Sequence, residues 1–172
     1  MANKIRNLKW RSIAVNLLLF ALMVAGIRMW QQRDMVSGAA PELSGTTLAG
    51  EAYTLAAHRG RPVLVQFWAS WCPVCRAEQS SIAAIAENDP DVITVAMQSG
   101  SAAQVAGYLR EQGISYPVLN DPDAAIANRW GVHAVPVSFI VAPDGSIRFV
   151  EVGYTTGVGI RIRRWLAGFL SP

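Results

Sequence analysis

The chain has few of the residues that bind metals or nucleic acids: two cysteines, two histidines, and no lysine after Lys9. Zinc sites normally combine about four Cys or His ligands, and His58 and His133 stand alone and far apart. Six of the fifteen basic residues precede position 34, so from Glu42 onward nine basic side chains face eleven acidic ones, a net charge of −2. The basic isoelectric point comes from the N-terminus and does not indicate nucleic acid binding.

The length and composition fit one domain of ordinary size with an appendage. The chain has 172 residues, of which 52% are hydrophobic and 16% charged, so a packed core is expected and wholesale disorder is not. The sequence contains no internal repeat and no low-complexity tract. We therefore expect a single folded domain, and a monomer is the expected oligomeric state, although nothing in the composition determines it.

An uncharged apolar run extends from Ser12 to Ile27 and is bracketed by Trp10 and Trp30. The roughly 19 residues between the tryptophans would rise about 29 Å as a helix, close to the hydrocarbon thickness of a bilayer. Four basic residues precede the run and two follow it, which favours a cytoplasmic N-terminus. The sequence predicts a cytoplasmic basic segment and then a single-pass transmembrane anchor, residues 1–11 and 12–30.

A cleaved signal peptide is the alternative interpretation of this segment. The small residues Ser37, Gly38 and Ala39 offer a cleavage site, but they lie about twelve residues beyond the apolar run, after three charged side chains. No cysteine follows the run closely, which disfavours a lipoprotein anchor. A buried core helix fits poorly, because the run is long and follows a basic N-terminus.

Residues 31–45 mix small and polar side chains with a proline, and we interpret them as a linker before a domain at 46–172. The domain pattern alternates strands and helices and ends in a hairpin and a helix: a hairpin at 47–55, strands at 63–69, 91–97 and 116–119, helices at 75–88, 101–113 and 123–130, a hairpin at 137–153 and a helix at 157–170. This order predicts an α/β fold with a mixed central sheet and helices on both faces. The last helix offers five side chains for the core: Ile160, Ile162, Trp165, Leu166 and Phe169.

Both cysteines, Cys72 and Cys75, lie between a buried strand and the predicted start of a helix. Copper(I) needs few soft ligands, so a copper site is one possible use of the pair. A purely structural disulfide is weak, because it closes a loop of only a few residues. A redox pair explains more, because helix N-terminal amides stabilise the thiolate that attacks disulfides. We expect Cys72 to be the exposed nucleophile and Cys75 the buried resolving thiol, with Pro73 suited to the first helical turn.

Three stretches of the sequence resemble the TlpA-like branch of the thioredoxin superfamily: FWASWCPVCRAE, YPVLNDPDAAIANRWGV and VPVSFIVAPDG. The resemblance covers about residues 43 to 170 and implies a thioredoxin-like fold with a redox-active disulfide and no organic cofactor or metal. An N-terminal anchor together with CPVC most resembles the suppressor of copper sensitivity protein D type. Peroxidases that share the fold carry a Pro-x-x-x-Thr/Ser-x-x-Cys pattern, and none is present.

The resemblance implies roles for particular side chains. Cys72 and Cys75 match the redox pair, and Pro136 matches the cis-proline of the superfamily, with Val135 offering backbone hydrogen bonds to an extended substrate. Pro136 could otherwise be a strand-entry proline. Glu78 matches a glutamate that TlpA-like proteins use near the pair, although a solvated acid on the helix face is the alternative. Three further residues would border the bound substrate: Trp71, Pro73 and Val74.

Two departures from the family pattern bear on the chemistry. Many TlpA-like members carry proline as the second residue between the cysteines, whereas this chain has Pro73 followed by Val74, so the usual reducing potential does not carry over directly. Gln66 occupies the position of the buried acid of ordinary thioredoxins, so a proton from Cys75 must go to Glu78, water or another group.

From this resemblance we expect a protein-disulfide oxidoreductase that reduces client disulfides in the periplasm and is held in the bacterial inner membrane. The expected partners are a disulfide-containing client protein and a membrane electron donor of the DsbD kind. The alternatives are a disulfide-forming oxidase and a copper(I)-binding protein that uses the two thiolates without catalysis.

Overall fold

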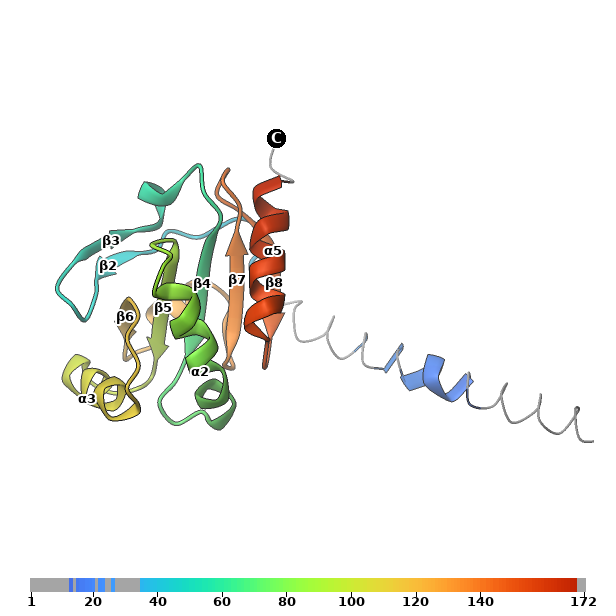
Figure 1. Ribbon diagram of the computed structural model, residues 1–172, viewed down its shortest axis with the longest axis horizontal. Coiled ribbons are helices and arrows are strands. Elements are labelled where there is room, and N and C mark those ends of the chain that lie inside the picture. The colour runs from blue at the N-terminus through green and yellow to red at the C-terminus, as the bar shows by residue number, and fades with distance from the viewer. Residues whose placement is uncertain (1–12, 14, 21, 24–25, 27–34, 170–172) are drawn as a thin grey trace, which may run out of the picture. The chain divides into compact units, whose positions relative to one another are not determined.

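The computed structural model describes residues 13, 15–20, 22–23, 26 and 35–169 of the chain (Figure 1). The chain divides into two compact units, Met1–Asp34 and Met35–Pro172. In the first unit the described residues between Ile13 and Gly26 are helical. Among the described residues, none of the helices combines the length and the apolar character that crossing a membrane requires. The rest of the predicted anchor and the whole cytoplasmic segment lie outside the described residues, so both stay predictions.

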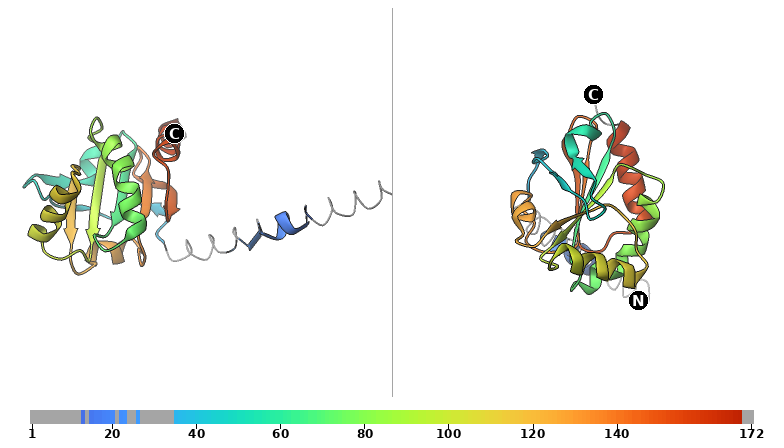
Figure 2. Two further views of the ribbon diagram at one scale, coloured as in Figure 1. Left: turned by 60° about the horizontal axis from the view of Figure 1, so that its bottom comes forward. Right: turned by 90° about the vertical axis from the view of Figure 1, so that its left-hand side faces the viewer.

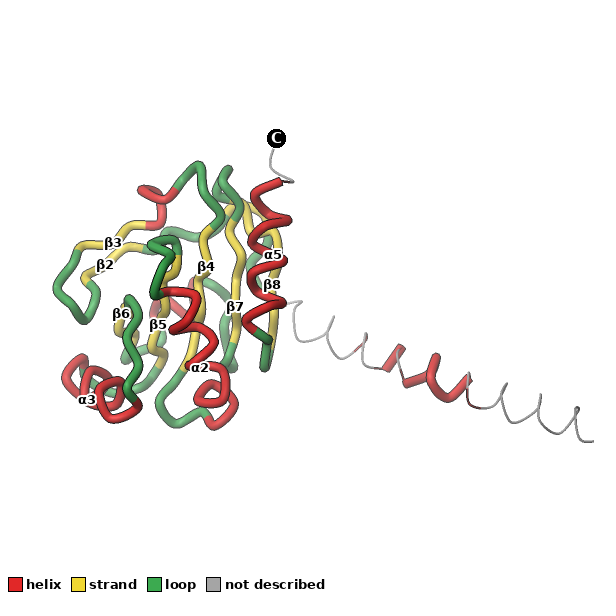
Figure 3. Tube along the Cα trace, viewed as in Figure 1, coloured by secondary structure: helices red, strands yellow, loops and turns green. Residues whose placement is uncertain are grey.

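The second unit is built on a six-stranded sheet with the order β1-β8-β7-β4-β5-β6 (Figure 3). Strands β4, β5 and β6 are parallel, whereas β7 pairs antiparallel with both β4 and β8, and β8 pairs antiparallel with β1. The strands are β1 Gly38–Ala39, β4 Val63–Trp68, β5 Val92–Met97, β6 Val118–Asp121, β7 Val137–Val141 and β8 Ser146–Val152. A separate hairpin pairs β2 Ser44–Thr46 with β3 Ala52–Thr54.

Helices cover both faces of the sheet (Figure 2). Their bounds are α2 Pro73–Ala86, α3 Ala102–Gln112, α4 Ala125–Arg129 and α5 Gly157–Phe169, with a 3-10 helix at Leu55–His58. Helix α3 begins at a capping box, in which Ser101 and Gln104 each bond the other's backbone N–H. It ends at Gly113, whose positive φ of 65° is the left-handed conformation that favours glycine.

Strand β4 is buried on both faces, and its alternating side chains separate two layers of the core. Val63, Val65 and Phe67 belong to the layer that includes the α4 residue Ala127. Leu64 packs in the layer formed by α2 and α5, and Trp68 belongs to a third cluster with the cysteine pair and α3. Side chains alternate along a strand, so Gln66 shares the face of Leu64 and Trp68. This is the face that meets α2.

The predicted α/β architecture and the order of its elements are confirmed, with four corrections. The folded unit begins before residue 46, because Gly38–Ala39 forms β1 and Leu43 is fully buried, so the predicted linker 31–45 is too long. The strand predicted at 116–119 lies two residues later. Helix α4 is shorter than expected, because the carboxylate of Asp121 accepts hydrogen bonds from the N–H groups of Ile126 and Ala127 and fixes its start.

The last correction concerns the core side of α5. Ile160 is buried and Leu166 is half-buried, as expected for side chains that face the sheet. Three of the five predicted core residues instead point to solvent: Ile162, Trp165 and Phe169. Arg164 and Ala167 face the core instead. An arginine is tolerated there because its guanidinium bonds Asp89 and the carbonyl of Pro62.

Candidate active site at the start of helix α2

A disulfide joins Cys72 and Cys75 at the N-terminus of α2, with 5.3 Å between their Cα atoms. Cys72 is the N-cap residue, and its Sγ accepts a hydrogen bond of 3.0 Å from the backbone N–H of Cys75. Pro73 occupies the first helical position, where its missing N–H costs no hydrogen bond. After reduction the same N–H and the positive end of the helix dipole would stabilise a thiolate on Cys72.

Both cysteines are buried in the oxidised state. Cys72 is 3% exposed and Cys75 is 1% exposed, so the expectation of an exposed Cys72 is wrong for this state. The two belong to one packed cluster with Trp68 and with Val105 and Leu109 of α3.

The loop before β7 faces the disulfide. The Val135–Pro136 peptide bond is cis, and Sγ of Cys72 lies 3.6 Å from the carbonyl oxygen of Val135. The carbonyl oxygen of Pro136 accepts a hydrogen bond of 2.9 Å from the N–H of Gly153, just after β8. Within the described part of the chain, the N–H of Val135 bonds to no other residue. A peptide lying along this loop would therefore find a free donor beside the sulfur atoms.

Exposed apolar side chains surround the disulfide. Trp71 is 58% exposed, and its Nε1–H is held by the carbonyl oxygen of Gln98 at 3.0 Å. Val74 on α2 and Tyr154 after β8 are also large apolar residues open to solvent, and Pro73 is exposed. Such a rim around a buried reactive bond is typical of a protein-binding surface. The sequence predicts Trp71, Pro73 and Val74 at this surface but gives no signal for Tyr154, which is distant in sequence and belongs to no motif.

Glu78 is fully buried one helical turn after Cys75. Its Oε2 accepts a hydrogen bond of 2.8 Å from Nε2 of Gln66, and its Oε1 accepts one of 2.9 Å from the N–H of Thr155. Burial raises the pKa of Glu78 to about 7, although both hydrogen bonds oppose that shift. The interpretation of Glu78 as a solvated acid on the helix surface is therefore wrong. A carboxyl group with this pKa can exchange a proton near neutral pH.

The buried partners of Glu78 come from two other segments of the chain. The sequence marks Gln66 only as a replacement for a buried acid and does not predict its contact with Glu78. A polar residue on the inner face of a buried strand is a signal for such a partner, because its amide must find hydrogen bonds. Thr155 left no signal, because it contributes only a backbone N–H from a loop 77 residues away.

The tryptophan that ends β4 fixes the strand against the neighbouring layers. Nε1 of Trp68 donates to Oγ1 of Thr94 on β5 at 3.1 Å, and its ring stacks on Tyr108 and meets Tyr116 edge to face. This packing holds the end of the strand from which the active-site turn departs. Among the described residues, no group of three or more His, Cys, Asp and Glu side chains is placed to hold a metal ion.

Comparison with known proteins agrees with this geometry. The family model Redoxin matches residues 35–159. A thioredoxin-like protein of Haemophilus influenzae is 27% identical over 91% of this chain and 94% of its own length. The thiol:disulfide interchange protein DsbE of Allochromatium vinosum is 32% identical over 82% of this chain and 81% of its own length.

Solved structures share the fold. The crystal structure of a thiol:disulfide interchange protein from Chlorobium tepidum superposes with a TM-score of 0.66 at 25% identity, covering 77% of this chain and 97% of the other. One family assignment accounts for the disulfide at the start of α2, the facing cis-proline loop and the similarity to these relatives. The chain belongs to the Redoxin family, within the DsbE-like and TlpA-like part of the thioredoxin superfamily, and is a protein-disulfide oxidoreductase that acts by thiol–disulfide exchange.

Proposed function

We propose that the protein reduces disulfide bonds of client proteins outside the cytoplasm, using electrons from a membrane donor of the DsbD kind. The observation that carries the proposal is the Cys72–Cys75 disulfide facing a free backbone donor, with the buried carboxyl of Glu78 one turn behind it. The reducing direction rests on the resemblance to TlpA-like proteins. The relatives named as thiol:disulfide interchange proteins support the exchange chemistry and leave its direction open.

The exchange proceeds in two displacements. The Cys72 thiolate attacks one sulfur of the client disulfide, the client S–S bond breaks, and the other client sulfur leaves as a thiolate. The Cys75 thiol gives its proton to Glu78, and its sulfur attacks Sγ of Cys72. The mixed disulfide breaks, and the second client sulfur also leaves as a thiolate while the pair is left oxidised. Glu78 gives up the Cys75 proton, and water supplies the proton that Cys72 lost on ionisation, so the client ends with two thiols. The donor then returns two electrons and two protons to the pair.

The client is proposed to lie as an extended strand along the Val135–Pro136 loop. The free N–H of Val135 would bond its backbone, and Trp71, Pro73 and Val74 would contact its side chains. Because these contacts are largely apolar and backbone-directed, they favour an unfolded or locally extended client over a tightly folded one.

We further propose that residues 12–30 form an uncleaved anchor that places the domain in the periplasm, with the N-terminus in the cytoplasm. The uncharged apolar run and its basic flanks support this proposal. Alkaline carbonate extraction of membranes tests the anchor, and added protease tests the side on which the domain lies. Release of the chain by carbonate would contradict the anchor.

The reduction potential of the pair tests the direction of electron flow. Equilibration with glutathione or dithiothreitol buffers should give a value of about −270 mV or below, as in thioredoxin. A value toward about −120 mV would make the protein an oxidant of client thiols. Stoichiometric copper(I) binding without any disulfide reductase activity would instead support the copper-binding alternative.

A further inference from the structure

The outer face of α5 carries a continuous apolar stripe formed by Val158, Ile162, Trp165 and Phe169. These side chains are 68%, 53%, 62% and 75% exposed, and their spacing of four, three and four residues places them on one side of the helix. The rings of Trp165 and Phe169 contact each other with centroids 5.0 Å apart. A surface helix normally exposes large apolar side chains singly, whereas α5 exposes four in a row.

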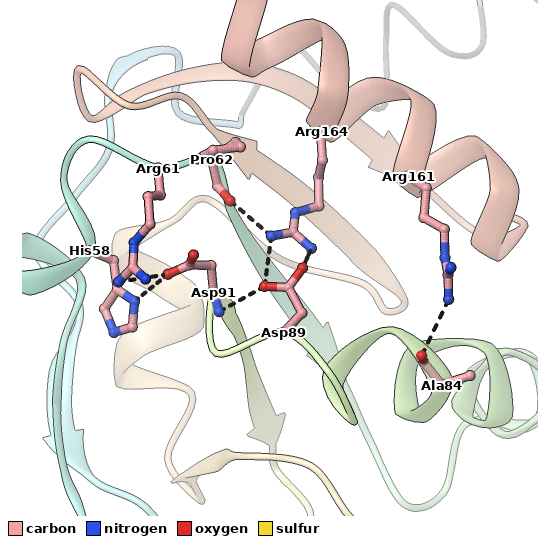
Figure 4. A network of polar contacts seen from close by, with 8 residues as sticks. All are labelled: His58, Arg61, Pro62, Ala84, Asp89, Asp91, Arg161 and Arg164. Carbon is pink, nitrogen blue, oxygen red and sulfur yellow. Dashed lines mark hydrogen bonds and ion pairs between the residues drawn. The ribbon is translucent and has the colours of Figure 1, made fainter.

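The charges of α5 are all positive. The helix contains three arginines and no acidic residue. Arg163 pairs with Glu151. Figure 4 shows the pair of Arg164 with Asp89. Arg161 donates to the carbonyl oxygen of Ala84, and in the described part of the chain it has no carboxylate partner.

A shallow groove of about 390 Å³ joins these features, because Trp165 and Phe169 line it together with Arg161. An aromatic and aliphatic stripe bordered by arginine is typical of helices that lie in the interface of a phospholipid bilayer. There tryptophan rings reside at the level of the headgroups, and guanidinium groups meet the phosphates.

The C-terminal part of this stripe lies at the end of the domain opposite the disulfide. Gly168 packs close to Pro62, which directly precedes β4, whereas Cys72 follows the other end of that strand. Six residues of strand rise about 20 Å, so a comparable distance separates the two ends.

The chain enters the folded unit at Met35 and reaches the sheet through β1. Gly38 of β1 pairs with Ile147, Ile147 pairs with Val141, and Val141 pairs with Val63 at the start of β4. Because β1 is antiparallel to β8, the residues before Gly38 lead back along β8, away from the end that carries Trp165 and Phe169. The apolar N-terminal run ends at Ile27, eight residues before Met35. Eight residues span at most about 29 Å when fully extended. If the run is a membrane anchor, as proposed above, the domain is held close to the bilayer.

We propose that the α5 stripe docks the domain on the surface of a phospholipid bilayer. Trp165 and Phe169 enter the headgroup region, Arg161 meets lipid phosphate, and the disulfide faces away from the membrane toward clients. The proposal goes beyond thiol–disulfide exchange, and its tether argument rests on the proposed anchor. The stripe itself and its arginines do not depend on that anchor.

The test places the photo-crosslinking residue p-benzoylphenylalanine at Trp165 in the full chain, reconstituted in liposomes of phosphatidylethanolamine and phosphatidylglycerol. The matched control places it at Ala103, which is exposed on α3 near the disulfide end of the domain. Both positions are exposed, so neither substitution opens the core. Disulfide formation in each variant checks that the domain is folded. After irradiation, mass spectrometry counts lipid adducts and electrophoresis counts crosslinked dimers.

The expected result is several-fold more lipid adduct from position 165 than from position 103. Equal lipid labelling at the two positions, or no labelling at either, would overturn the docking proposal. Crosslinked dimers in place of lipid adducts at position 165 would also overturn it and would assign the stripe to a second copy of the chain. Carbonate extraction of the same liposomes reports on the anchor separately, and insulin reduction reports on the exchange reaction, so the three proposals can fail independently.

Discussion

Gln66 on β4 and Glu78 on α2 form a buried hydrogen bond, with Nε2 of the amide 2.8 Å from Oε2 of the carboxyl group. The contact ties the central strand to the helix that carries the redox pair. Burial raises the pKa of Glu78, and the two donors, Gln66 and the N–H of Thr155, limit that rise. The structure thus holds a proton acceptor with a pKa of about 7 one turn behind Cys75.

Replacing Gln66 with leucine should raise the pKa of Glu78 further, because the ionised carboxylate loses a buried donor. We expect a rise of about one unit, equivalent to about 1.4 kcal/mol. Carbon-13 NMR of labelled glutamate side chains across the pH range measures the shift. A pKa that falls or stays unchanged would show that Gln66 does not stabilise the charged form.

The stability of the oxidised protein should decrease between pH 5 and pH 8 through Glu78. Its pKa is about 7 in the folded state against about 4.5 for an unperturbed glutamate, so the native state binds more protons than the unfolded chain in this interval. The contribution is full below the unfolded pKa and is lost as pH rises through about 7, on the order of 3 kcal/mol. Urea denaturation at several pH values measures the slope, and Glu78→Gln should flatten it.

Glu78→Gln should also slow the exchange reaction, because the variant cannot accept the proton of Cys75. At pH 7 we expect a loss of at least about tenfold in the rate of insulin reduction, with a flatter dependence on pH. The fold should survive, since a glutamine can still accept from Thr155. The matched control is Glu87→Gln, an exposed acid just after the same helix. Equal losses in both variants would mean that the effect is not specific to Glu78.

Cys75→Ser should trap mixed disulfides between Cys72 and client proteins. The first displacement still takes place in this variant, but the resolving sulfur is absent, so the covalent complex persists. Non-reducing electrophoresis of the full chain after incubation with oxidised client detects the complex. Cys72→Ser should form none, while its hydroxyl preserves the N-cap of α2. Complexes that form with Cys72→Ser and not with Cys75→Ser would reverse the assigned roles.

Trp71→Ala should weaken the reaction with protein clients more than the reaction with a small disulfide. Because the side chain is largely exposed, we expect a change in unfolding free energy below about 0.5 kcal/mol. KM for a protein client should rise several-fold, whereas kcat for hydroxyethyl disulfide should stay near the original value. Trp165→Ala serves as a control for loss of an exposed tryptophan away from the disulfide. A similar rise in KM in both variants would contradict a specific role for Trp71.

Local sequence signals were sufficient to locate the reactive pair, the start of α2 and both ends of α3. The helix start at Cys72–Pro73, the capping Ser101 and the terminating Gly113 act through residues within about one turn, and such short-range chemistry can be read directly from the chain. The alternation of apolar runs likewise predicted the order of strands and helices. The cis-proline loop was located by its resemblance to a family, because no local propensity brings Pro136 to Cys72.

The sequence by itself determined that a CxxC pair stands at the start of a helix in an α/β domain behind an apolar N-terminal run. Only the tertiary structure decided the environment of that pair. It buried Glu78 against Gln66 and a backbone N–H 77 residues away, packed the cysteine pair in one cluster with residues of α3, and turned Trp165 and Phe169 outward. Burial and hydrogen bonding between distant segments depend on how elements pack. Periodicity assigns an apolar side to a helix, but the packing against the sheet decides which side is covered.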